Sequence, residues 1–213
     1  MPDDSSETRW LLLAYKVANE PSKLRVGLWR RLRGMGAVYI QGGVCVLRNT
    51  SEYQRQLRAL QGEVLRAGGE AVLFEVLPLD PKQQALVVDR FKRDRDDDYE
   101  EFLDKCSDFK REVQKEVKAS HYSFAELQEN EEDLKKLRNW LAKIEALDHF
   151  GASARALAER ELSACEQVLD AYANTVFDRE HGIREATAGA ERQRVAGRPV
   201  KRAEKGRRRP RKR

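Results

Sequence analysis

Cysteine, histidine and long apolar runs are all scarce in this chain of 213 residues. Its cysteines, Cys45, Cys106 and Cys165, lie about 60 residues apart without a CxxC pair, so they indicate reduced core thiols rather than a zinc site or redox pair. The three histidines are equally dispersed, and no recognisable catalytic motif accompanies them. The longest apolar run, residues 10–15, is too short for a membrane span or a secretory signal. We therefore expect a cytoplasmic, non-catalytic protein with no membrane partner, no metal and no cofactor.

Charged residues, in contrast, make up 36% of the chain, and their signs are unevenly distributed. Residues 184–213 contain 13 Lys or Arg and 3 Asp or Glu, a net charge of +10, whereas residues 1–183 carry a net charge of −5. The basic segment has few large apolar side chains, so burial cannot offset its ordering entropy, and we predict a disordered basic tail. A tail of this kind can bind the phosphates of nucleic acid. The alternatives are that it binds an anionic membrane or that it only keeps the protein soluble.

Apolar patterning and turn residues predict an α+β protein whose residues 9–80 have the element order β-α-β-β-α-β. The expected strands are residues 10–17, 37–41, 44–47 and 71–77, and the expected helices are residues 22–35 and 52–67. The first strand is apolar on both faces, which places it centrally, and Gly42-Gly43 predicts a hairpin. Two helices on one face of four such strands give the ferredoxin-like arrangement.

Residues 81–180 are predicted to form a helical extension, and the polar residues 1–8 a disordered N-terminus. The expected helices are residues 82–119, with a kink near the acidic run, 130–148 and 153–179. Their narrow apolar stripes, spaced near 3.5 residues, indicate a helical hairpin, bundle or coiled coil. The partner surface can come from the same chain or from a homodimer.

The first predicted helix has an unopposed basic face, because residues 22–36 contain no Asp or Glu. Leu24, Leu28, Leu32 and Met35 point to the core, and the residues on the opposite face are Lys23, Arg30 and Arg33. A face of this kind can lie along phosphates and release their counterions. The alternative is a solvated face of a surface helix.

Arg25 and Trp29 lie one turn apart at the edge of the apolar face, so we expect Arg25 to be partly buried. A buried guanidinium needs an anion, a carboxylate or carbonyl groups. Arg25 is therefore a candidate contact for chromate or another oxyanion. The alternative is a structural ion pair with the stem of Arg25 packed on Trp29.

Six acidic residues between 94 and 101 suggest a metal site at first sight. They lack the ligand spacing and central glycine of a calcium loop. Interleaved Lys and Arg instead favour a solvent-exposed helix face with mixed charges.

Residues 10–172 resemble the N-terminal domain of the ChrB family of chromate-resistance proteins. The similarity begins at Trp10-Leu11-Leu12-Leu13, is most specific at residues 24–32, and continues through Gly36-Ala37, Gly43-Val44, Asp98-Tyr99 and residues 144–150. The resemblance implies a cytoplasmic, chromate-responsive regulator that binds DNA near a chromate-efflux operon. Typical members are longer and have a second C-terminal domain, in whose place this chain has the basic segment.

The same predicted fold also resembles a domain of PaaX-type repressors and the small CRISPR-associated nucleases. Those nucleases hold a metal with an Asp at the end of the first strand, but residues 15–19 here include no carboxylate. This departure argues against a two-metal nuclease.

The sequence thus favours a DNA-binding regulator, with a protein–protein accessory or scaffold factor as the main alternative and a nuclease as a weaker one. The expected nucleic-acid contacts are Lys23, Arg30, Arg33, Lys201, Arg202, Arg207, Arg208, Arg209, Arg211, Lys212 and Arg213.

Overall fold

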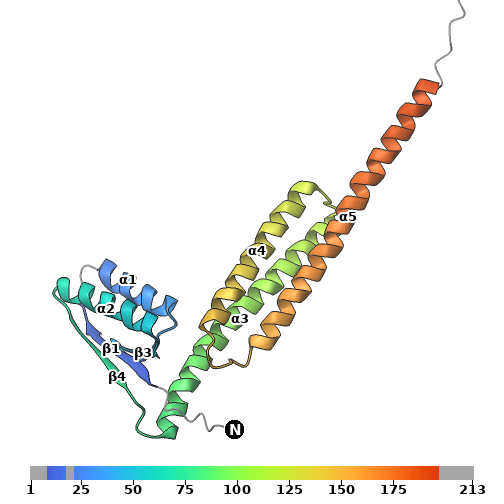
Figure 1. Cartoon of the computed structure of the whole chain (residues 1–213). Helices are drawn as coiled ribbons and strands as arrows, with labels where there is room; N and C mark the ends of the chain where they lie inside the picture. Colours follow the sequence, from blue (N-terminus) through green and yellow to red (C-terminus); the bar gives the residue numbers. More distant parts are fainter. Residues whose placement is uncertain (1–8, 18–21, 197–213) are drawn as a thin grey trace, which may run out of the picture.

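The chain forms a small α/β domain followed by a long three-helix bundle (Figure 1). This computed structural model describes residues 9–17 and 22–196, so the predicted N-terminal segment 1–8 and the basic residues from 197 onward lie outside the described residues. The α/β domain consists of β1 (Trp10–Lys16), α1 (Ser22–Gly34), β2 (Val38–Gln41), β3 (Val44–Arg48), α2 (Ser51–Arg66) and β4 (Glu70–Val76). The bundle consists of α3 (Pro81–Ala119), α4 (Phe124–Leu147) and α5 (Arg155–Ala196).

The four strands form one antiparallel sheet in the order β2-β3-β1-β4. β1 is central, as its two apolar faces predict: Leu13 pairs with Cys45 of β3 on one side and with Leu73 of β4 on the other. The predicted hairpin joins β2 to β3 through Gly42 and Gly43. The predicted order of strands and helices over this region is therefore confirmed.

Helices α1 and α2 cover one face of the sheet (Figure 1). β1 contributes Leu11 and Leu13 to this core, and the helices contribute Leu28, Leu32, Leu57, Leu60 and Val64. Thr50 begins α2 by accepting a hydrogen bond from the Tyr53 backbone N–H at 3.1 Å, which satisfies one of the free donors at the helix start.

The first turns of α3 cover part of the opposite sheet face. Trp10, on β1, stacks on Phe91 of α3 with ring centroids 5.2 Å apart, and Phe150 completes the aromatic cluster at 5.7 Å from Trp10. The Trp10 indole N–H donates to Gln84 at 2.9 Å, and Arg90 donates to the Tyr39 carbonyl at 3.0 Å. These contacts fix the bundle to the sheet.

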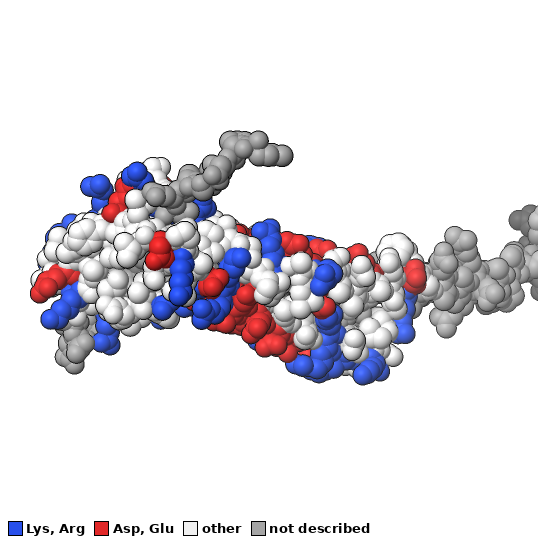
Figure 2. All heavy atoms as spheres, turned by 90° about the horizontal axis from the view of Figure 1, so that it is seen from below, with Lys and Arg blue, Asp and Glu red and all other residues white. Residues whose placement is uncertain are grey.

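The β4 side of this second face stays exposed. Val72 and Phe74 are 48% and 52% exposed, although they lie on a sheet. Seen from below, this part of the molecule is largely uncharged, whereas charges of both signs crowd the helices (Figure 2).

The apolar stripes of the three long helices pack against one another within the chain. The shared core contains Tyr99, Phe102, Cys106, Phe109, Val113, Leu134, Leu137, Leu141, Ile144, Cys165, Leu169, Tyr172 and Val176. All three cysteines are reduced and buried, as predicted. None of the helices in the described ranges is both long enough and apolar enough to span a membrane.

α3 is one continuous helix through the acidic run, and the kink predicted there stays a prediction. Two predicted helix boundaries are wrong. α4 begins six residues before the predicted start, because Ser123 caps it by accepting from the Glu126 N–H at 3.2 Å. α5 continues to Ala196, so residues 184–196 are helical rather than part of a disordered tail; their Ala, Glu, Arg and Gln are strong helix formers.

Replacement of Phe91 by Ala tests the contact between bundle and sheet. Phe91 is 5% exposed, so its truncation leaves a cavity beside Trp10 and should lower the free energy of unfolding by about 3–5 kcal/mol. Urea denaturation followed by circular dichroism measures this. Phe177→Ala is the control: that side chain is 62% exposed, and its loss should change stability by less than about 0.5 kcal/mol. Equal effects of both substitutions would contradict the described packing.

Candidate nucleic-acid interface

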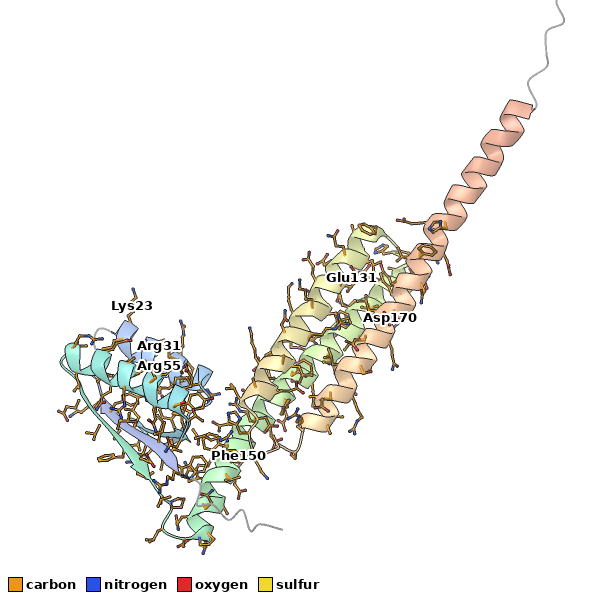
Figure 3. All side chains as sticks on the ribbon, viewed as in Figure 1. Lys23, Arg31, Arg55, Glu131, Phe150 and Asp170 are labelled. Carbon is orange, nitrogen blue, oxygen red and sulfur yellow. The ribbon has the colours of Figure 1, made fainter. Side chains whose placement is uncertain are left out.

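α1 has one buried and one exposed face. Leu28 and Leu32 are fully buried against the sheet, one turn apart. The exposed face includes Lys23, Arg30 and Arg33, the three residues that the sequence predicts as phosphate contacts. In Figure 3, Lys23 points away from the rest of the domain.

The three basic side chains are not neutralised by nearby acids. Among the residues that the structure describes, no ion pair joins Lys23, Arg30 or Arg33 to a carboxylate. Burial, the largest effect, raises the pKa of the Asp98 carboxyl, and the positive charges of Arg95 and then Arg33 partly oppose that rise. This face therefore presents positive charge to solvent.

Arg31, on the same helix, has a structural role instead. It makes a bidentate ion pair with Glu63 of α2, with N–O distances of 2.8 and 2.5 Å. The hydrogen bonds from Arg31 lower the pKa of the Glu63 carboxyl. The ion pair joins the two helices side by side and leaves Lys23, Arg30 and Arg33 as the outward charges.

The expected partial burial of Arg25 is wrong. Arg25 is exposed, and Trp29 is 48% exposed, because the one-turn spacing places both residues beyond the edge where α1 meets the sheet. The two side chains instead line a cavity of about 320 Å³ between α1 and the β2–β3 hairpin. Its lining consists of Tyr15, Arg25, Val26, Trp29, Tyr39, Gly42 and Gly43.

Two tyrosines and a glycine turn shape this cavity. The Tyr15 and Tyr39 hydroxyl groups are hydrogen-bonded at 2.9 Å, and burial raises the pKa of both, so they stay protonated at neutral pH. Gly43 has no side chain to fill the cavity, and another residue does not fit in its place. A Cβ at this position would lie 2.4 Å from the Tyr15 carbonyl oxygen, and the φ angle of Gly43 is +76°. The glycines thereby leave the aromatic walls accessible.

The acidic run on α3 is not simply the solvent-exposed face that its composition indicates. Arg95 is buried and pairs with Asp98 at 2.9 Å. Asp96 accepts hydrogen bonds from the Ala154 backbone N–H at 2.8 Å and from the Ser153 hydroxyl at 3.1 Å, and so caps the start of α5. These residues hold the start of α5 against α3.

A buried acid lies close to that junction. Asp148 accepts from the Tyr99 hydroxyl at 3.3 Å and from the Ala152 N–H at 3.0 Å. Its carboxylate thus links α3 to the connection between α4 and α5. Within residues 9–17 and 22–196, no group of three His, Cys, Asp or Glu side chains has the arrangement of a metal site.

The predicted contacts in the basic tail are not placed by the structure. Lys201, Arg202, Lys212 and the neighbouring arginines all lie outside the described residues. The described part of the candidate interface therefore consists of the basic face of α1 and the adjoining cavity.

Comparison with known proteins places this architecture in a family. The family described as "Protein ChrB, N-terminal" matches residues 25–183. The chain belongs to the ChrB N-terminal family. Protein ChrB of Cupriavidus metallidurans is 28% identical over 99 residues, an alignment that covers 46% of this chain and 30% of that protein. No solved structure matches the chain.

Several of the residues that carry the family resemblance meet at the junction between sheet and bundle. Tyr99 bonds Asp148, and Phe150 stacks near Trp10. A Cβ at Gly36 would lie 3.3 Å from the Leu147 side chain, so a glycine is needed where the α1–β2 turn approaches α4. These residues therefore support the fold. The most specific part of the resemblance, residues 24–32, lies on α1 and includes Arg30 of its basic face.

Sequence reasoning missed the cavity beside Trp29 and the capping role of Asp96. Tyr15 and Tyr39 are 24 residues apart in the sequence, and Asp96 and Ala154 are 58 residues apart. No local sequence pattern therefore predicts either contact. A signal did exist for the start of α4, since Ser123 and Glu126 have the spacing of a capping box.

Asp96→Ala should destabilise the bundle, because it removes the acceptor from two donors at the start of α5. We expect a loss of about 1–2 kcal/mol in the free energy of unfolding, measured by urea titration. Asp97→Ala removes an exposed neighbouring carboxylate of equal charge and is the control. A larger loss for Asp97→Ala would contradict the capping role.

Proposed function

We propose that this chain is a non-catalytic, DNA-binding regulatory protein of the ChrB type, acting in chromate resistance. The observation that carries the proposal is the exposed face of α1, where Lys23, Arg30 and Arg33 have no acidic partner among the described residues. Family membership supports the link to chromate resistance.

The chemistry of this face suits phosphates. Three basic residues on one side of a rigid helix can neutralise neighbouring phosphates and release their counterions, which makes binding depend strongly on salt. Contacts of this kind position a protein on DNA without reading its bases. The basic residues 197–213, ten of which are Lys or Arg, add further phosphate contacts.

The ferredoxin-like assignment is part of this proposal. An antiparallel sheet in the order β2-β3-β1-β4, with α1 and α2 on one face, supports it. In this arrangement α1 and α2 cover the sheet face opposite to the one that α3 contacts (Figure 1).

The alternatives have less support. A scaffold or homodimer built on the helical stripes would need those stripes exposed, but their residues are buried within the chain. A nuclease would need clustered carboxylates, and Asp148, the one buried acid of the described region, is engaged by Tyr99 and a backbone N–H group. A chromate or other oxyanion contact at Arg25 stays a prediction.

The triple variant Lys23→Gln, Arg30→Gln, Arg33→Gln tests the α1 face. We expect weaker binding to duplex DNA, and a plot of log K against log salt that is shallower by about 3, one for each lost phosphate contact. Fluorescence anisotropy between 50 and 200 mM salt, about the range over which such contacts weaken sharply, measures both quantities.

The matched control removes the same charge from the bundle through Lys105→Gln, Arg111→Gln and Lys136→Gln. These residues are exposed and each pairs with an aspartate on its own helix, so DNA binding should be unchanged. A wild-type affinity independent of salt, or no binding at about 50 mM salt, would refute the proposed function.

Removal of residues 197–213 tests the tail separately and keeps α5 at its full length. The deletion takes away ten basic residues and one acidic residue, so affinity should fall similarly for every DNA sequence. Electrophoretic mobility shift with a promoter fragment and with random DNA measures this. A selective loss for one sequence would mean that the tail reads bases, contrary to our expectation.

A further inference from the structure

The lining of the cavity beside Trp29 includes three aromatic side chains, Tyr15, Trp29 and Tyr39, and the glycines of the β2–β3 turn. The Trp29 side chain is half exposed, whereas Tyr15 and Tyr39 are partly buried. At about 320 Å³ it lies at the small end of ligand cavities, large enough for one flat ring system.

The charge around this cavity is positive. Arg25 is the one charged residue among the described residues that line it. Lys23, Arg30 and Arg33 lie on the same short helix. A ligand there would pair an aromatic ring with a nearby anion.

We propose that this cavity holds a single unpaired DNA base, stacked on Trp29, while the basic residues of α1 contact the adjoining phosphates. The inference rests on the proposed function and gives the α1 face a preferred form of DNA. A paired base hides its flat surfaces between its neighbours, so only an unpaired or displaced base can stack on the indole. The α1 face therefore favours single-stranded or locally unpaired DNA over perfect duplex.

The tyrosine pair supplies the polar part of the site. The Tyr15 and Tyr39 hydroxyl groups bond each other at 2.9 Å, and each oxygen retains a further hydrogen-bonding position. Since both stay protonated, they are neutral partners for the donors and acceptors at a base edge. Stacking with few fixed hydrogen bonds predicts tolerance of different bases at this position.

Trp29→Ala, measured by fluorescence anisotropy, tests the inference with three ligands: a short single strand, an abasic strand of equal length, and the perfect duplex. The wild type should bind the base-containing strand more tightly than the abasic one. The substitution should weaken that binding by about 5- to 100-fold, the effect of one lost base–aromatic stack, and change abasic and duplex binding by less than about 2-fold. Trp29→Phe, which retains a ring, should restore most of the preference.

Phe74→Ala is the matched control. Phe74 is 52% exposed, close to the 48% of Trp29, but it lies on the other face of the sheet, so its loss should leave all three affinities unchanged. An independent readout is quenching of tryptophan fluorescence by the single strand, since Trp10 is 2% exposed and Trp29 is the most exposed of the three tryptophans.

The outcomes separate the two proposals. If Trp29→Ala leaves the single-strand preference intact while the Lys23, Arg30 and Arg33 triple variant abolishes binding, the cavity inference is wrong and the proposed function stands. If the wild type prefers the abasic strand or the perfect duplex, the cavity inference is also wrong. If the wild type binds none of the three ligands, both proposals fail.

Discussion

The stack of Trp10 on Phe91 determines how the two parts of the molecule can be arranged. The four-stranded sheet of this protein has apolar residues on both faces, and α1 and α2 cover one of these faces. The second face would leave Trp10 in water unless another element packed there, and the first turns of α3 do so. Because α3 is continuous to Ala119, this local contact also fixes the direction of the whole bundle.

Buried polar groups reinforce the same junction. Asp96 and Asp148 each accept hydrogen bonds from backbone N–H groups near the start of α5, and Tyr99 connects one of them to α3. Unsatisfied, such donors would destabilise a buried turn. The junction therefore has both an aromatic and a hydrogen-bonded part, and some of the residues that carry the family resemblance lie there.

Local signals explain why most of the fold is predictable from sequence. Thr50 and the Gly68-Gly69 pair bound α2, and the Gly42-Gly43 pair marks the hairpin, so each element is specified within a few residues. The capping role of Asp96 could not be predicted, because its partner Ala154 is distant in the sequence. From the sequence alone, Asp96 belongs to a solvent-exposed run of charges. The basic face of α1 follows from helix periodicity alone, whereas the cavity requires the hairpin and helix to meet in space. Charge density alone does not locate the end of α5, because residues with high helix propensity continue the helix into the basic segment.

The length of α5 has a consequence for how the basic segments cooperate. At about 1.5 Å per residue its 42 residues extend about 63 Å, and in Figure 1 its C-terminal end points away from the α/β domain. The helix is a stiff spacer, unlike a flexible linker whose ends meet often. Under the proposed function, the local concentration of one basic segment near DNA bound by the other would depend on the length of that DNA, and about 18 base pairs match the length of the helix. Avidity would then be a matter of the length of the ligand.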